Sequence, residues 1–278
     1  MAYAAPDPRD LPPDPRLQVP STYQRDTIIQ ALTDLYERLP HIDPSDVHRA
    51  PAGGWPEITD QSIAARGLRK TAGAVDLLRH LPYITGPANC WVAPEACAVD
   101  YRAVVGTAAA NGSGSGPNQP WLWELSKPGL REARFPPWVV QLTTGNDAES
   151  ACYMLDTMDG TVTKFVMTGP VYPDPPGLYA DGDPRAWRDK WCDDWTMPLE
   201  DLVREWLDKY RTMRFVGMPG KKSWPGVLVH REREGDFMWE ETTAMREVYS
   251  EHGWPDHYRG QNCREAILQW WANRRSRT

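Results

Sequence analysis

The densest group of side chains able to transfer protons lies near the carboxyl terminus. His252, Asp256 and His257 fall within six consecutive positions, and histidine exchanges protons near neutral pH. A glycine and a proline separate the two histidines, so they do not share a helical face as a metal-binding pair would. The sequence favours a structural corner here, with Trp254 buried and the polar groups capping. An acid–base site is the alternative interpretation.

Two adjacent aspartates, Asp193 and Asp194, form a second acidic group. They begin like the aspartate-rich metal motif of class I terpene cyclases, and Asn146-Asp147 with Ser150 resembles the second metal motif of those enzymes. The two motifs stand in the opposite order along this chain, which also lacks the many long helices of such a fold. We therefore expect a solvated loop, no metal site and no cofactor. The aspartate pair is kept as a second candidate for acid–base work.

Three tryptophans, Trp187, Trp191 and Trp195, recur every fourth residue in a proline-rich loop, 169–197. This spacing is that of one helical face, and buried packing is the favoured interpretation. The functional alternative is an aromatic rim that contacts a peptide or ligand, because aromatic side chains are enriched at interfaces. The chain has 14 tryptophans, so we expect long loops pinned by aromatic side chains.

Segment 106–120 is a low-complexity stretch rich in Gly and Ser. Some Gly-rich loops hold phosphate, but this one lacks the Lys-Ser/Thr ending of a P-loop and the spacing of a dinucleotide fingerprint. A flexible surface loop is therefore expected. The sequence contains no GxSxG motif and no assignable Cys–His pair, so it carries no specific catalytic motif.

Charge and composition argue against several broad classes. The 278 residues carry a net charge of −7 with a pI near 5.4, which disfavours a general nucleic-acid binder. We expect no membrane span, because no apolar run approaches the required length, and no signal peptide, because the amino terminus lacks a basic region and an apolar run. The five cysteines form no CxxC pair, and we expect reduced, buried thiols in a cytoplasmic or nuclear protein.

The elements that must position these residues centre on 138–211. Segments 138–143 and 151–168 are rich in β-branched and aromatic residues. Asp159-Gly160 supplies a tight turn, so 151–168 is predicted to be an antiparallel hairpin with 138–143 as a neighbouring strand. A helix beginning at Pro198 is predicted over 198–212. Its apolar residues form one stripe at helical spacing: Leu199, Leu202, Val203, Trp206, Leu207 and Tyr210. We expect this stripe, with Trp206 at its middle, to pack on the hairpin.

Helical patterns flank this central sheet. Further helices are predicted over 21–39, after Thr59, and over 71–81, 240–252 and 263–275, the last capped by Asn262. Further strands are predicted over 90–92, 98–101 and 213–216. The predicted fold class is therefore α+β, a central antiparallel sheet covered by helices. We expect residues 1–20 to form an extended arm and 21–278 a single domain, with a flexible loop at 106–120.

Several phrases resemble a family of uncharacterised proteins from filamentous fungi: 54–59, 77–84, 155–162 and 251–256. That family implies no activity. The stretch 138–211, about a quarter of the chain, is also similar to the SUKH superfamily, which includes fungal cell-wall-synthesis regulators and bacterial toxin-immunity proteins. In both, a strand hairpin carrying an acidic residue and a turn precedes a helix. This resemblance implies a SUKH-like core, an α+β binding module without catalytic residues.

Two functions from different classes follow. The favoured one is a protein-binding or regulatory module that uses the aromatic loop 169–197 as its contact surface, without catalysis. The alternative is a small fungal biosynthetic enzyme, a transferase, cyclase or hydrolase, with an acid–base site made by the His and Asp groups. That enzyme requires those side chains to line one concave pocket with an aromatic wall. The expected partner is a protein or a small molecule, with neither nucleic acid nor membrane.

Overall fold

The computed structural model describes residues 4–85, 91–106, 122, 135–145, 151–166, 177–189, 195–219, 226–236 and 238–275. Within these residues the fold is α+β, as predicted. The helices are α1 (Arg25–Arg38), α2 (Asp60–Ala65), α3 (Ala72–His80), α4 (Tyr101–Gly106), α5 (Leu199–Arg211), α6 (Trp239–Glu251) and α7 (Gly260–Arg275). Single 3₁₀ turns cover Pro8–Asp10, Pro44–Asp46 and Ala186–Asp189.

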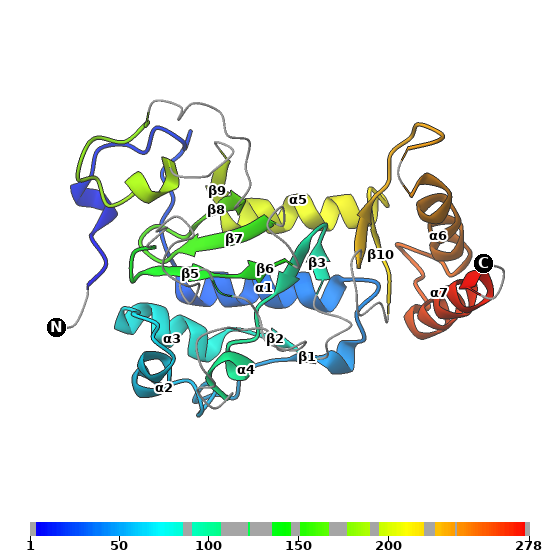
Figure 1. Cartoon of the computed structure of the whole chain (residues 1–278), viewed down its shortest axis with the longest axis horizontal. Coiled ribbons are helices and arrows are strands. Elements are labelled where there is room, and N and C mark those ends of the chain that lie inside the picture. The colour runs from blue at the N-terminus through cyan, green and yellow to red at the C-terminus, as the bar shows by residue number, and fades with distance from the viewer. Residues whose placement is uncertain are drawn as a thin grey trace.

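The strands form four antiparallel sheets. They are β1 (Val47–His48), β2 (Tyr83–Ile84), β3 (Trp91–Ala93), β4 (Ala96–Ala98), β5 (Val139–Gln141), β6 (Thr143–Thr144), β7 (Ala151–Asp156), β8 (Thr161–Val166), β9 (Thr196–Pro198), β10 (Phe215–Gly217) and β11 (Val227–Val229). The largest sheet has the order β5-β7-β8-β9, and a second has the order β3-β4-β6. The pairs β1-β2 and β10-β11 make the other two. Figure 1 shows the largest sheet near the middle of the molecule, beside α5.

The predicted hairpin is confirmed. Strands β7 and β8 pair antiparallel, with Leu155 opposite Val162. Gly160 has a φ of +78°, a conformation that favours glycine and that the tight turn requires. Along β7, Tyr153 and Leu155 face the main hydrophobic cluster, whereas Met154 faces a separate cluster on the other side of the sheet. Both sides of this strand are therefore covered.

The predicted stripe of α5 is also confirmed. Its residues Leu199, Leu202, Val203, Trp206 and Tyr210 are buried. The ring of Trp206 meets that of Tyr153 edge-on, with the centroids 4.9 Å apart, so the helix packs on the hairpin as expected. The Tyr210 hydroxyl donates a hydrogen bond to the carbonyl of Val92 at 3.0 Å, which joins α5 to β3.

The amino-terminal helices complete the main core. Helix α1 packs against α5 and α3, and α2 packs against α3. A capping box in which Thr59 and Ser62 bond to each other's backbone N–H groups fixes the start of α2. The Thr71 side chain accepts from the N–H of Ala74 and caps α3. Helices α2 and α3 therefore each begin at a residue whose side chain satisfies a free backbone donor.

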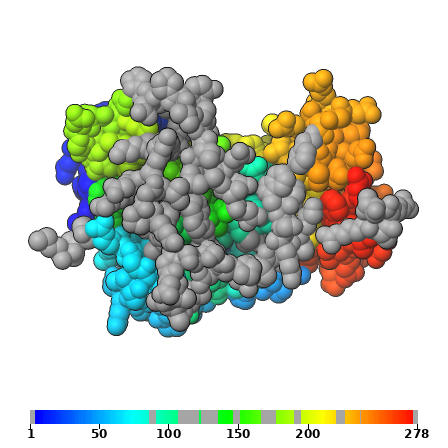
Figure 2. All heavy atoms as spheres, in the orientation of Figure 1, coloured from blue at the N-terminus to red at the C-terminus, as the bar shows by residue number. Residues whose placement is uncertain are grey.

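A second hydrophobic cluster joins α6, α7 and the β10-β11 ribbon. Its buried members are Met213, Val216, Met218, Leu228, Met245, Tyr249, Cys263 and Ile267. This carboxy-terminal unit stands at the right-hand end of the molecule in Figures 1 and 2. Tyr258 donates to the carbonyl of Pro40 at 2.7 Å, and Arg264 pairs with Asp43 at 2.8 Å. These two contacts tie the unit to the segment after α1.

Three predicted boundaries are wrong. The strand expected over 98–101 ends at Ala98, because the Asp100 carboxylate accepts from the N–H of Arg102 at 2.9 Å and begins the helical turn of α4. Helix α7 begins at Gly260, so Asn262 lies inside it and does not cap it. Pro198 ends β9 and caps α5 instead of opening it. Each observed boundary differs from the predicted one by three residues or fewer.

The expectation of reduced cysteines is also corrected. Cys97 is disulfide-bonded, and its partner lies outside the described residues. Cys152 and Cys263 are free and buried, as expected for packed thiols. Of the predicted 106–120 loop, Gly106 ends α4 and residues 107–120 lie outside the described part of the chain.

Candidate binding groove

One of the three tryptophans of the predicted aromatic rim is buried. Trp187 is only 8% exposed, and its ring packs edge-on against Phe135 at 5.6 Å, so in this structure it is a core side chain. Trp195 is half-buried and lies 5.7 Å from the ring of Tyr153. Trp191 lies outside the described residues. The favoured packing interpretation therefore holds for Trp187.

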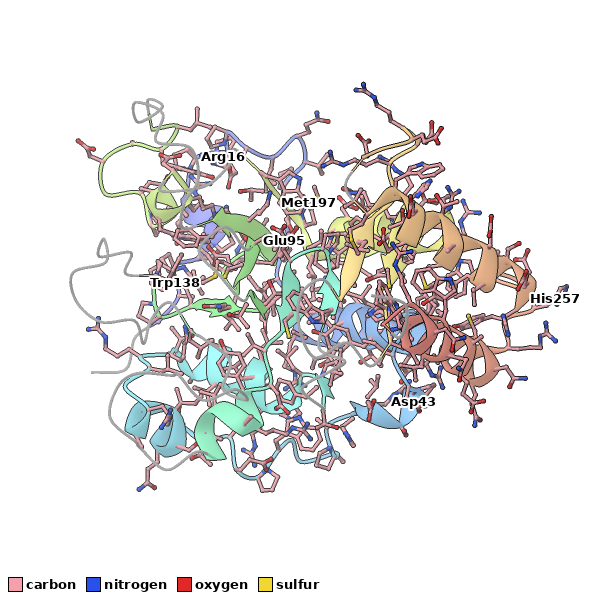
Figure 3. The ribbon with its side chains drawn as sticks, turned by 45° about the vertical axis from the view of Figure 1, so that its right-hand side comes forward. Arg16, Asp43, Glu95, Trp138, Met197 and His257 are labelled. Atoms are coloured by element: carbon pink, nitrogen blue, oxygen red, sulfur yellow. The ribbon has the colours of Figure 1, made fainter. Side chains whose placement is uncertain are left out.

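The histidine–aspartate group near the carboxyl terminus lies on the turn after α6. His252 is half-buried and bonds through Nδ1 to the carbonyl of Val248 at 2.8 Å, whereas Asp256 and His257 are exposed. Figure 3 shows His257 at the outer edge of the molecule. None of the three lines the groove described below. The turn is thus a corner, with Trp254 half-buried instead of fully buried.

The second candidate pair, Asp193 and Asp194, lies outside the described residues, so its proposed acid–base role stays a prediction. Among the residues that the structure describes, no three His, Cys, Asp or Glu side chains come close enough to hold a metal ion. None of the described helices is long and apolar enough to cross a membrane.

A buried ion-pair network at the other end of the molecule was not predicted. The guanidinium of Arg188, which is fully buried, reaches three carboxylates. Its Nη1 donates to Asp14 at 2.6 Å, and its Nη2 donates to Asp156 at 2.7 Å and to Asp159 at 2.8 Å. The network therefore joins the amino-terminal arm, the β7-β8 turn and the 3₁₀ turn that carries Arg188.

Further contacts fix the arm in the same place. Arg16 pairs with Asp189 at 2.7 Å, and the Tyr179 hydroxyl donates to Asp14 at 2.8 Å. Arg185 donates to the carbonyl of Pro12 at 3.0 Å. Figure 3 shows Arg16 beside the segment 177–189. Buried charges therefore fasten the segment 4–20 to the body of the protein.

Local sequence explains how two of these arginines are oriented. In Asp14-Pro15-Arg16 the carboxylate accepts from the N–H of the arginine at 2.8 Å. In 183–185 the Asp183 carboxylate accepts from both the N–H and the guanidinium of Arg185. Each Asp-Pro-Arg turn therefore sets the direction in which its arginine leaves the backbone.

Burial raises the pKa of Asp156 to about 6, and the charge of Arg188 opposes this rise. The neighbouring Asp159 carboxylate raises the pKa further. Asp14 also lies 3.8 Å from the guanidinium of Arg185, whereas Asp156 and Asp159 share the single guanidinium of Arg188, so part of the negative charge of this pair is uncompensated. Their chemistry is that of a structural anchor, since the arginine is already bonded to all three.

Among the residues that the structure describes, an open groove beside α6 is a candidate for a binding site. It has a volume of about 590 Å³, within the size range of ligand pockets. Its lining residues come from the end of α5, the segment after β11, α6 and the following turn: Arg211, Thr212, Met213, His230, Glu232, Trp239, Thr243, Arg246, Glu247, Ser250, Trp254 and Pro255. Met213 is buried, whereas Trp239 and Trp254 are half-buried, so the groove has an apolar floor and aromatic sides.

Helix α6 presents two different faces. Thr242, Met245 and Tyr249 are buried against the β10-β11 ribbon and α7. The groove is lined instead by Trp239, Thr243, Arg246, Glu247 and Ser250, which recur at helical spacing on another face of the same helix. One helix therefore supplies both core packing and a wall of the groove.

Several polar groups in the groove lack protein partners. Arg246 is half-buried and makes no hydrogen bond or ion pair with the residues that the structure describes. The Thr243 hydroxyl oxygen is buried and has no hydrogen-bond partner. The Thr243 oxygen is closed off from solvent, whereas Arg246 is partly accessible. Buried polar groups are normally satisfied, so Arg246 points to a ligand that supplies acceptors.

His230 completes the polar part of the groove. Its Nδ1 lies 2.9 Å from the hydroxyl of Thr242, which itself donates to the carbonyl of Met238 at 3.0 Å. Nδ1 is therefore the donor and Nε2 is free to accept when the ring is neutral. Burial lowers the pKa of His230, and the charge of Arg246 lowers it further, so the neutral ring is favoured.

Only part of this groove could have been identified from the sequence. Trp239, Thr243 and Arg246 share a helical face that the period of α6 would have revealed. The opposite wall, from Arg211 to Met213 and at Trp254, depends on tertiary packing. Trp254 is held there because its Nε1 donates to the carbonyls of Tyr210 at 3.1 Å and Arg211 at 3.3 Å.

Comparisons with known proteins identify no relative from which a function could be inferred. No protein-family model, curated protein or solved structure matches it. The resemblances to the filamentous-fungal family and to the SUKH superfamily therefore stay predictions.

Proposed function

We propose that this chain is a non-catalytic module that binds a segment of a protein partner in the groove beside α6. The observation that carries the proposal is the unpartnered guanidinium of Arg246, which lines the groove together with Trp239 and Trp254. Arginine and tryptophan are enriched in interface hot spots. We place the contact surface in this groove and not in the loop 169–197, because Trp187 of that loop is buried.

The shape of the groove favours a chain segment over an enclosed small molecule. Its α6 wall runs from Trp239 to Ser250, a length of about 16 Å at 1.5 Å per residue. A segment of about five residues in extended conformation spans this distance. Open grooves of this kind accept peptides that lie along a helix face.

The acid–base alternative receives no comparable support. Its condition was a shared concave pocket, and Asp256 and His257 are exposed at the turn.

The expectation of a cytoplasmic or nuclear location depended on reduced thiols. The disulfide at Cys97 removes that basis, because disulfides persist mainly in oxidising compartments.

Selection from a random peptide library displayed on phage tests the proposal. We expect the wild-type protein to enrich peptides that bind in solution and that lose binding to the Trp239→Ala variant. Trp270→Ala is the matched control, since Trp270 is also half-buried but lies on α7 outside the groove. Enriched peptides that bind the Trp239→Ala variant as well as the wild type, or no enrichment at all, would refute the proposal.

A further inference from the structure

The groove offers more hydrogen-bond donors than acceptors in its half-buried part. Arg246, the Thr243 hydroxyl and the Trp239 indole N–H make no hydrogen bond with any described residue. The Nε2 of His230 is an acceptor, and the Thr243 hydroxyl can donate and accept, so the guanidinium of Arg246 and the indole N–H account for the excess of donors. Glu232 and Glu247 also line the groove, but both are exposed and remain hydrated. A ligand that matches this set carries many acceptors and few donors.

A proline-rich chain has this character. Each proline keeps its carbonyl acceptor but has no N–H donor. Such segments adopt the extended polyproline II conformation, whose carbonyls are not bonded within the segment. Recognition domains for these segments use grooves lined by aromatic rings, and here Trp239 and Trp254 line the groove with Pro255 beside them.

The charge in the groove adds a second requirement. Arg246 is half-buried without a paired carboxylate among the described residues, and a guanidinium taken out of water is stabilised best by a carboxylate that accepts two of its N–H groups. By contrast, Arg211 at the rim is 65% exposed and already pairs with Asp208. Arg246 is therefore the position at which an acidic ligand side chain would bind.

We propose that the groove recognises a proline-rich segment of about five residues that carries one carboxylate side chain, which binds Arg246 while its prolines contact Trp239 and Trp254. This inference rests on the proposed function and names the class of partner. The pattern is an aspartate or glutamate flanked by prolines. The two exposed glutamates at the rim further favour a segment whose ends are not acidic.

Fluorescence anisotropy with labelled peptides tests this inference. The probe is a capped Ala-Pro-Pro-Asp-Pro-Pro-Ala peptide, compared with one in which Asn replaces Asp and one in which Ala replaces every Pro. We expect the Asn peptide and the Ala peptide each to bind at least about tenfold more weakly than the probe. The Asn peptide lacks the carboxylate that binds Arg246, and the Ala peptide lacks the prolines that preorganise the extended conformation. The variant Arg246→Gln should weaken the probe by a similar factor without affecting the Asn peptide. Arg233→Gln, an exposed arginine outside the groove, should bind like the wild type.

The outcomes separate this inference from the proposed function. If the phage selection enriches peptides that need Trp239 but contain neither proline nor an acid, the binding module stands and the ligand class is wrong. If the probe and its Asn counterpart bind equally, the role of Arg246 is refuted. If the library yields no peptide that needs Trp239, the proposed function itself fails. Equal denaturation midpoints of wild type and Arg246→Gln show that any loss of binding is not a loss of folding.

Discussion

The buried carboxylate of Asp156 provides a prediction about pH whose sign and size follow from the structure. Its pKa is raised from 3.8 to about 6, and burial is the largest cause of this rise. Between these two values the folded protein holds more protons than the unfolded chain, so stability falls as pH rises. The contribution is fully present below 3.8 and is lost as pH rises through about 6. A difference of roughly two pKa units corresponds to about 3 kcal/mol.

The perturbation is Asp156→Asn, which keeps an oxygen to accept from the N–H of Met158, now 2.8 Å from the carboxylate, but cannot ionise. Urea denaturation of wild type and variant near pH 4 and near pH 7 measures the free energy of unfolding of each. From pH 4 to pH 7, the free energy of unfolding of the variant should rise by about 2–3 kcal/mol relative to that of the wild type. The comparison of differences removes the titration of every other group.

Asp183→Asn is the matched control. The hydrogen bond from Arg185 lowers the pKa of Asp183, so its contribution to stability is present above 3.8 and is lost only as pH falls below that value. The difference between this variant and the wild type should therefore stay constant between about pH 4 and pH 7. A constant difference for Asp156→Asn as well would refute the reasoning, since it would mean that Arg188 outweighs burial and keeps Asp156 ionised throughout.

Two further predictions concern stability. Trp206→Ala should lower the free energy of unfolding by about 3–5 kcal/mol, because the ring is 4% exposed and packs on Tyr153. Glu205→Ala on the same helix should change the free energy of unfolding by less than about 1 kcal/mol. Equal urea midpoints of the two variants would mean that the apolar stripe of α5 faces solvent. Arg188→Met should lower the free energy of unfolding by about 3–5 kcal/mol, because it leaves the buried carboxylates of Asp156 and Asp159 without their arginine. Arg204→Met, which removes a pair whose arginine is 75% exposed, should lower it by less than about 1 kcal/mol. A small loss for Arg188→Met would show that water reaches the network.

The parts of the fold that could be predicted are those encoded over short distances along the chain. The stripe of α5 follows from helical periodicity, and the β7-β8 hairpin follows from alternation ended by Asp159-Gly160. Helix α2 follows from the side chain of Thr59. In each case the residues that specify the element lie within about one or two turns of it, so a local pattern was sufficient.

The parts that could not be predicted depend on pairings between distant segments. Arg188 and Asp14 are 174 residues apart, and nothing in the neighbourhood of either residue indicates the other. Trp187 shows the same limit. Its spacing to Trp191 and Trp195 suggested one helical face, yet Ala186–Asp189 forms only a 3₁₀ turn, and the ring packs on Phe135 from a separate segment. The spacing of the tryptophans suggested a shared face but could not indicate which segment that face contacts.

The position of the groove implies that ligand binding and the docking of the carboxy-terminal unit are coupled. One wall belongs to α6, whereas another belongs to the end of α5 and is joined to Trp254 by hydrogen bonds to Tyr210 and Arg211. Separation of the two parts would divide the groove, so a ligand that contacts both walls binds only the docked state. Such a ligand stabilises docking by an amount that grows with its concentration relative to its dissociation constant. The Arg188 network lies elsewhere and supplies no groove residue, so changes there should alter the stability of the body while leaving the affinity of the groove unchanged.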